Sequence, residues 1–146
     1  AAALTFLAHE RGGPKLAFQI LANPLLDATL SSPSVEELAT GYFLTKAQFD
    51  WCYEKYAPGE KRKSPLVSPV LQDDFSKSVP AAIVTAEYDP VRDDGERYAE
   101  SLRASNISVH HERILGHVHH FGGADRTPTL LRLVDTLLSE LKSQKE

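Results

Sequence analysis

The second half of the chain alternates short apolar runs with amphipathic helical patterns, and this order restricts the possible fold most strongly. Residues 81–86 form an apolar run that predicts a buried strand, and residues 107–114 predict a second strand with alternating apolar positions. Residues 93–104 and 128–141 carry apolar side chains at helical spacing. The order strand, helix, strand, helix favours a right-handed crossover. We therefore expect an α/β fold with a mostly parallel sheet flanked by helices.

The first half of the chain predicts further elements of the same fold. Residues 1–11 are rich in Ala and Leu and predict a helix, and residues 16–21 predict a short buried strand. Ser34 precedes acidic residues and is expected to cap a helix. Thr45 is expected to open another helix that ends at Tyr56, before a proline. We expect residues 24–79 to form a helical excursion that walls a pocket.

Composition excludes several classes of function. The chain has 146 residues and a formal net charge of -4, so nucleic acid is not an expected partner. Its only basic cluster, Lys61-Arg62-Lys63, is short and is expected to be a solvated loop. No apolar run approaches the roughly 20 residues that a membrane span requires. Cys52 is the only cysteine, so no internal disulfide can form; we expect a buried thiol and a cytoplasmic protein.

Two residues with catalytic side chains follow the predicted strands of the second half. Asp89 comes just after the strand at 81–86, and His119 follows the strand at 107–114 and a turn at Gly116. Ligands of parallel sheets bind beyond the carboxyl ends of the strands, so the two loops can meet. A carboxylate that orients a histidine base is two thirds of a nucleophilic triad. No serine of this chain lies in a Gly-x-Ser-x-Gly turn, the usual housing of the nucleophile.

Residues 84–95 (VTAEYDPVRDDG) closely resemble the acid loop of the hormone-sensitive-lipase-like carboxylesterases, which are α/β-hydrolases. Residues 116–121 (GHVHHF) are similar to the histidine loop of that family, and residues 41–45 (GYFLT) and 64–66 (SPL) also resemble family segments. The resemblance runs in order over nearly the whole chain and covers only the C-terminal half of such an enzyme. It implies that residues 1–146 form one partial α/β-hydrolase domain.

The resemblance also implies a function and two residue roles. It implies hydrolysis of carboxylic esters without a cofactor or metal, on a small ester substrate, with Asp89 orienting His119. The family's serine turn and its oxyanion segment would lie before Ala1, so the chain alone is expected to be inactive. Two positions depart from the family pattern: His120 stands where the family usually has Gly, and His117 replaces a more usual apolar residue.

Several residues offer alternatives to these assignments. Asp93 and Asp94 are the rival carboxylates, although both also suit the first turn of a helix. Asp89 itself could merely begin a turn. His117, His119 and His120 could together bind a metal, but their spacing matches no familiar zinc site. The pair at 110–111 alternates along a strand and is expected at the surface or edge.

The missing nucleophile leaves open a second class of function, a non-catalytic binding or interaction module. The chain contains no Met and starts in a helix without an N-cap, so we expect that it begins inside a longer protein. The strand at 16–21 would then lack a neighbour, and a bare apolar strand edge invites pairing. The expected partners are therefore the missing N-terminal half or a second copy of the chain.

Overall fold

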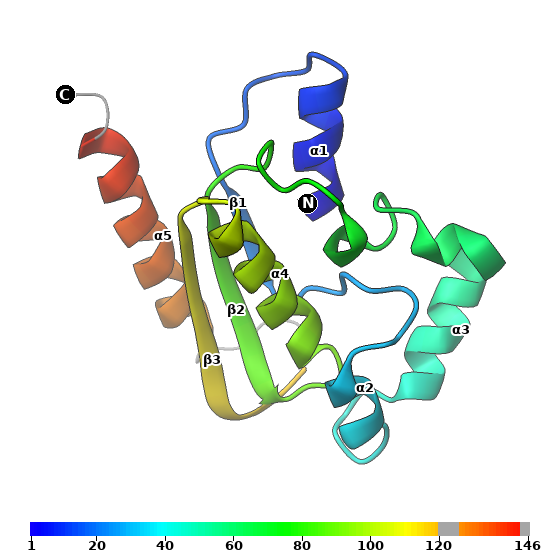
Figure 1. Ribbon diagram of the computed structural model, residues 1–146. Coiled ribbons are helices and arrows are strands. Elements are labelled where there is room, and N and C mark those ends of the chain that lie inside the picture. The colour runs from blue at the N-terminus through cyan, green and yellow to red at the C-terminus, as the bar shows by residue number, and fades with distance from the viewer. Residues whose placement is uncertain (120–125, 144–146) are drawn as a thin grey trace.

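A parallel sheet forms the centre of the computed structural model, which describes residues 1–119 and 126–143 (Figure 1). Strands β1 (Gln19–Ala22), β2 (Ala81–Tyr88) and β3 (Val109–Val118) lie in the order β1-β2-β3, and each neighbouring pair is parallel. This confirms the expected α/β fold with a parallel sheet flanked by helices. The described helices include none that is both long and apolar enough to cross a lipid bilayer.

Helices cover the two faces of the sheet because successive side chains of β2 point to opposite sides. Helix α4 (Arg92–Ala104) packs on one face and α5 (Arg126–Ser143) on the other (Figure 1). Residues 81–86 of β2 are all buried, as expected for a strand covered on both faces. One apolar cluster includes Ala81, Ile83, Tyr98 and Leu102, and the opposite cluster includes Ala82, Val84, Leu133 and Leu137.

Helix α1 (Ala2–Glu10) extends the α4 side of the core. Phe6 is 3% exposed and joins the same cluster as Tyr98 through Phe75, whose ring makes edge contacts with both aromatic rings. No side chain caps the start of α1, as the sequence predicted. Strand β1 is shorter than predicted and starts at Gln19 rather than residue 16, because Gln19 is the partner of Ala81, where β2 begins.

The excursion between β1 and β2 contains helices α2 (Pro33–Glu37) and α3 (Lys46–Tyr56) and two short 3-10 helices, η1 (Gly59–Lys63) and η2 (Pro69–Leu71). Thr45 opens α3 with a capping box, as predicted. The predicted cap of α2 was wrong by two residues: Ser32 holds that position, and Ser34 lies inside the helix. The excursion therefore packs short helices beside α4 rather than adding to the sheet.

Two predictions for the excursion were wrong. Cys52 is exposed, because α3 buries only one narrow stripe of side chains that includes Phe49 and Tyr53, while Cys52 lies on the solvent side. The basic cluster at 61–63 is the last turn of η1 and not an irregular loop. Arg62 donates to the carboxylates of Asp50 (2.6 Å) and Glu54 (3.1 Å), and these contacts hold η1 against α3.

Candidate active site

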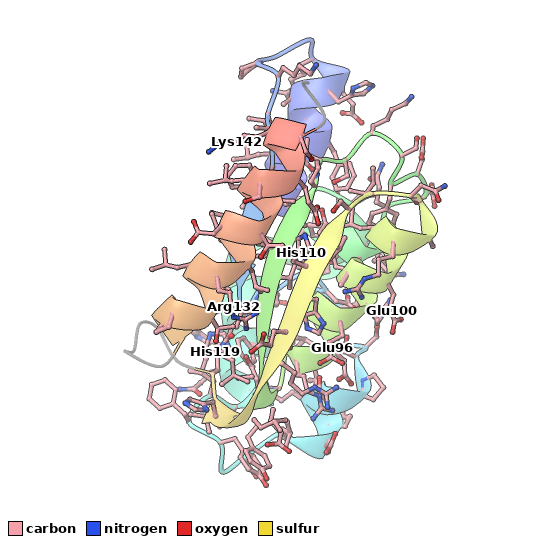
Figure 2. All side chains as sticks on the ribbon, turned by 90° about the vertical axis from the view of Figure 1, so that its left-hand side faces the viewer. Glu96, Glu100, His110, His119, Arg132 and Lys142 are labelled. Atoms are coloured by element: carbon pink, nitrogen blue, oxygen red, sulfur yellow. The ribbon has the colours of Figure 1, made fainter. Side chains whose placement is uncertain are left out.

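The register of the sheet brings the two predicted site residues together. Tyr88, the last residue of β2, is the register partner of Val118, the last residue of β3. Asp89 and His119 are the next residue in each loop, so both leave the same edge of the sheet from adjacent strands. Figure 2 shows His119 at this end of β3, near the start of α5.

A bulge in β3 makes this register possible. Between two pairs of register partners, β2 has only Glu87 whereas β3 has Leu115, Gly116 and His117. Gly116 takes a φ of 73°, a left-handed conformation that favours glycine, and its N–H donates to the Glu87 carboxylate at 2.7 Å. The extra residues bend the strand end, as bulges beside active sites often do, and bring His119 level with Asp89.

The Asp89 carboxylate divides its two oxygens between two donors. Oδ1 accepts the backbone N–H of Val91 at 3.0 Å, which fixes the side chain in a tight turn. Oδ2 lies 2.9 Å from Nδ1 of His119. Since a carboxylate only accepts hydrogen bonds, Nδ1 is the donor of this pair. Asp89 is 0% exposed and His119 is 1% exposed, so water does not compete strongly for their hydrogen bond.

Helix α2 holds the backbone of the acid loop in place. Ser34 donates its hydroxyl to the carbonyl oxygen of Pro90 at 2.8 Å and accepts the N–H of Asp93 at 3.1 Å. Its own N–H donates to the Asp93 carboxylate at 2.8 Å. Arg92 adds an ion pair to Glu37 at 2.8 Å. The excursion thus positions Asp89 indirectly, by bonding both sides of the loop that carries it.

Aromatic side chains pack around the pair. Phe49 of α3 is buried, and its ring makes an edge contact with the His119 imidazole at a centroid distance of 6.0 Å. Tyr42 stacks on Tyr88, the residue before Asp89, with ring centroids 5.4 Å apart and nearly parallel planes. The aromatic side chains of α3 divide between the core and the surface. Phe49 is buried in the core beside His119, while Trp51 and Tyr56 are exposed.

Asp93 and Asp94, the alternatives to Asp89 as the orienting acid, make structural hydrogen bonds and ion pairs instead. Asp93 bonds Ser34 and Arg92, and Asp94 is a buried acceptor with 1% exposure. Asp94 accepts the backbone N–H groups of Leu26 (3.0 Å) and Asp27 (2.9 Å) and the hydroxyl of Ser32 (2.5 Å). Burial raises the pKa of Asp94 to about 6. The sequence predicted Asp94 only as an acid in the first turn of a helix. In the structure, its carboxylate also joins the loop after β1 to α4 through these three hydrogen bonds.

The other histidines of β3 have separate neighbours. Nε2 of His110 lies 3.0 Å from the Glu140 carboxylate on α5, while Nε2 of His111 lies 3.0 Å from the Thr85 hydroxyl on the α4 side. Their opposite directions agree with the alternation expected of a strand. Burial lowers the pKa of His111. Within residues 1–119 and 126–143, no group of three His, Cys, Asp or Glu side chains could hold a metal; His120 lies outside them.

The chain belongs to the alpha/beta hydrolase fold family, whose sequence model matches residues 1–122. The arylesterase of Saccharolobus solfataricus is 39% identical over 77% of this chain and 38% of the relative. The ethyl acetate hydrolase of Pseudomonas putida is 36% identical over 77% of this chain and 35% of the relative. These matches confirm the predicted resemblance to carboxylesterases.

Solved esterases have the same fold. A thermostable esterase from Pseudomonas putida matches with a TM-score of 0.82 and 32% identity over 98% of this chain, but only 47% of the esterase. The chain therefore spans less than half the length of the relatives to which it is similar. More than half of each such protein has no counterpart in these 146 residues.

Proposed function

We propose that this chain supplies the acid and the base of a Ser-His-Asp triad in a carboxylic ester hydrolase. The observation that carries the proposal is the buried 2.9 Å hydrogen bond between Nδ1 of His119 and the Asp89 carboxylate, at the carboxyl edge of a parallel sheet. The serine would come from a segment outside residues 1–146. We use the name full-length esterase for the natural protein that contains this sequence and that segment.

In the full-length esterase, Nε2 of His119 accepts the proton of the serine hydroxyl as its oxygen attacks the ester carbonyl. Asp89 keeps the proton of the neutral imidazole on Nδ1 and stabilises the imidazolium that forms. His119 then donates the proton to the departing alcohol, which leaves an acyl-enzyme. Water, activated by the same imidazole, releases the acid and restores the serine. Backbone N–H groups outside this chain would stabilise the oxyanion, and no cofactor takes part.

The names of the relatives support small esters as the substrate class. One relative is named an ethyl acetate hydrolase and another an arylesterase, and the first name describes an ester with a short acyl group. We therefore assign a short acyl ester to this protein. Phe49, buried against His119, would contribute to the apolar surroundings that such a substrate requires.

The outer edge of β1 is the proposed docking place of the serine-bearing segment. In the described residues β1 pairs only with β2, and Ile20 of β1 is 42% exposed. Beside it, Leu4 is 60% exposed and lines an apolar hollow of about 370 Å³ with Leu7 and Leu16. The opposite edge, β3, is protected by charged side chains such as Glu112 and Arg113. More than half of the similar esterase from Pseudomonas putida has no counterpart in this chain, and we assign the β1 edge to that part of the full-length esterase.

Labelling with a fluorophosphonate probe tests the proposal. The probe reacts with a serine only when a base activates it, so we expect the full-length esterase to be labelled at one serine outside residues 1–146. The His119→Ala substitution should abolish labelling. His117→Ala is the matched control, because His117 precedes His119 by two residues and its Nδ1 lies 2.8 Å from the carbonyl oxygen of Leu115. This variant should retain labelling.

The same experiment discriminates between an esterase and a non-catalytic module. A full-length protein that folds but takes no label, or one that His119→Ala leaves fully labelled, contradicts the triad. The first of these results would favour an interaction module, with Asp89 and His119 as a buried structural pair. The isolated 146-residue chain should remain unlabelled in every variant.

A further inference from the structure

Phe49 of α3 contacts the imidazole of the candidate base. The two rings make an edge contact at a centroid distance of 6.0 Å, with an angle of 67° between their planes. Aromatic pairs prefer such edge contacts at centroid distances of about 4.5–7 Å. Phe49 is 5% exposed and His119 is 1% exposed, so the contact is buried. Helix α3 therefore packs directly against the side chain that the proposed function uses as the base.

The hydrogen bond to Asp89 fixes one atom of the His119 ring but not the plane of the ring. Oδ2 of Asp89 lies 2.9 Å from Nδ1, and the imidazole can still tilt about this contact. The torsion that turns a histidine ring has broad minima, so packing must select its value. A tilt would move Nε2, on the far side of the ring, away from the serine. The ring of Phe49 provides a flat surface that restrains this motion.

The apolar cluster around Phe49 also contains a residue of the acid loop. Val91 is 1% exposed, belongs to the same cluster, and donates its N–H to Oδ1 of Asp89 at 3.0 Å. One packed unit therefore supports both members of the pair: the acid through a backbone N–H, and the base through a ring contact. Because protein interiors are close-packed, a change at Phe49 is transmitted to the neighbouring rings rather than absorbed by empty space.

Contacts on both sides of Phe49 fix the position of α3. Before it, the N–H of Gln48 donates to the Thr45 hydroxyl at 3.2 Å, and the N–H of Thr45 donates to the Gln48 side chain at 2.8 Å. After it, Arg62 of η1 donates to the Asp50 carboxylate at 2.6 Å. A side chain that orients another group works best on such a fixed element. Phe49 therefore presents its ring to His119 from a defined place.

We propose that Phe49 is a positioning residue that sets the plane of the His119 imidazole in the full-length esterase, an inference that rests on the proposed function. Phe49 acts through His119 and needs no contact with the reacting atoms. Asp89 holds Nδ1 and Phe49 sets the plane, so that Nε2 keeps the direction in which it meets the serine hydroxyl. The helical excursion then contributes to the chemical step itself.

The test compares the steady-state kinetics of two phenylalanine variants of the full-length esterase. Phe49→Leu removes the ring beside His119 and should lower kcat about tenfold with KM little changed, because a small misplacement of a catalytic group slows the chemical step. Phe75→Leu is the matched control, since Phe75 is 7% exposed and makes edge contacts with Phe6 and Tyr98 in the apolar cluster on the α4 side. This control should lower the melting temperature but leave kcat unchanged.

Phe49→Tyr and Phe49→Met separate the ring from the volume that it fills. Tyrosine keeps a flat ring at this position and should retain most of kcat. Methionine fills the space with a flexible chain, so the variant should fold well and yet lose kcat as Phe49→Leu does. The rate of fluorophosphonate labelling should follow the same order, because the probe requires the same base.

Two results would overturn the inference while the proposed function stands. One is a folded Phe49→Met variant with the kcat of the wild type, which would reduce Phe49 to a core residue. The other is a Phe49→Leu variant whose KM rises while kcat is unchanged, which would make Phe49 a contact of the substrate. A wild-type full-length protein that takes no label contradicts the proposed function and this inference together.

Discussion

Replacing Asp89 with asparagine is expected to lower kcat of the full-length esterase about 10⁴-fold, the size of effect known for the equivalent change in a serine protease triad. Asp89 accepts the Nδ1–H of His119 at 2.9 Å, whereas an asparagine can present its N–H₂ group to Nδ1 instead. The proton of the neutral imidazole would then move to Nε2, and the base would no longer be available to the serine. Initial rates on p-nitrophenyl acetate measure this loss.

The exposed residue Asp135 provides the control for Asp89→Asn. Asp135→Asn makes the same chemical change on the surface of α5 and should leave kcat within twofold of the wild type. A kcat for Asp89→Asn within tenfold of the wild type would contradict the role of Asp89 as the orienting acid. In that case Asp93, one of the two rival carboxylates, would be the next residue to replace.

The largest effect on stability is expected from Asp94→Ala. The carboxylate of Asp94 accepts two backbone N–H groups, from Leu26 and Asp27, and the hydroxyl of Ser32. Its removal leaves these buried donors without acceptors, and each such group costs about 1–3 kcal/mol. We expect the free energy of unfolding to fall by about 3–5 kcal/mol. Urea denaturation followed by circular dichroism measures it, and a loss below about 1 kcal/mol would show that the loop finds other acceptors.

The matched control, Asp94→Asn, should keep all three contacts. An amide oxygen can accept both N–H groups, and its N–H₂ group can donate to the Ser32 hydroxyl, which also accepts hydrogen bonds. This variant should therefore retain most of the stability that Asp94→Ala loses. Asparagine also has no ionisable side chain, so this variant serves as the reference for the pH dependence of the stability of the wild type.

Stability should depend on pH through Asp94. Burial raises the pKa of Asp94 from 3.8 to about 6, so the folded state holds this proton more tightly than the unfolded state. The resulting stabilisation is complete below pH 3.8 and is lost as the pH rises through about 6. Relative to Asp94→Asn, the wild type should lose about 3 kcal/mol over this range. A constant difference between the two proteins would contradict the raised pKa.

The order of the elements and the meeting of Asp89 with His119 could be predicted from the sequence, for a physical reason. The apolar run at 81–86 and the helical pattern at 93–104 are local signals, and a crossover between parallel strands has one favoured hand. Two residues that follow adjacent parallel strands necessarily leave the same edge of the sheet. This topology brings the two loops together, and the bulge in β3 then places His119 within 2.9 Å of Asp89.

The supporting contacts of the site could not be predicted, because they join residues far apart in the sequence. Ser34 bonds the acid loop at Pro90 and Asp93, across 56 to 59 positions. Asp94 contacts Leu26 across 68 positions. The sequence places Asp93 and Asp94 at the start of a helix, but it does not show that Asp94 is buried. Gly116 partly indicated the bulge. The hydrogen bond from its N–H to the Glu87 carboxylate could not be predicted, because it depends on the register of β2 and β3.

The tautomer of His119, read from its nitrogen chemical shifts by long-range ¹H–¹⁵N NMR, shows directly whether Asp89 orients this ring. Asp89 accepts from Nδ1 in a site that is almost fully buried, so the proton of the neutral ring should reside on Nδ1 and leave Nε2 as the base. The Asp89→Asn variant should reverse this assignment. A neutral His119 protonated on Nε2 in the wild-type protein would contradict the acid–base pair on which the proposed esterase depends.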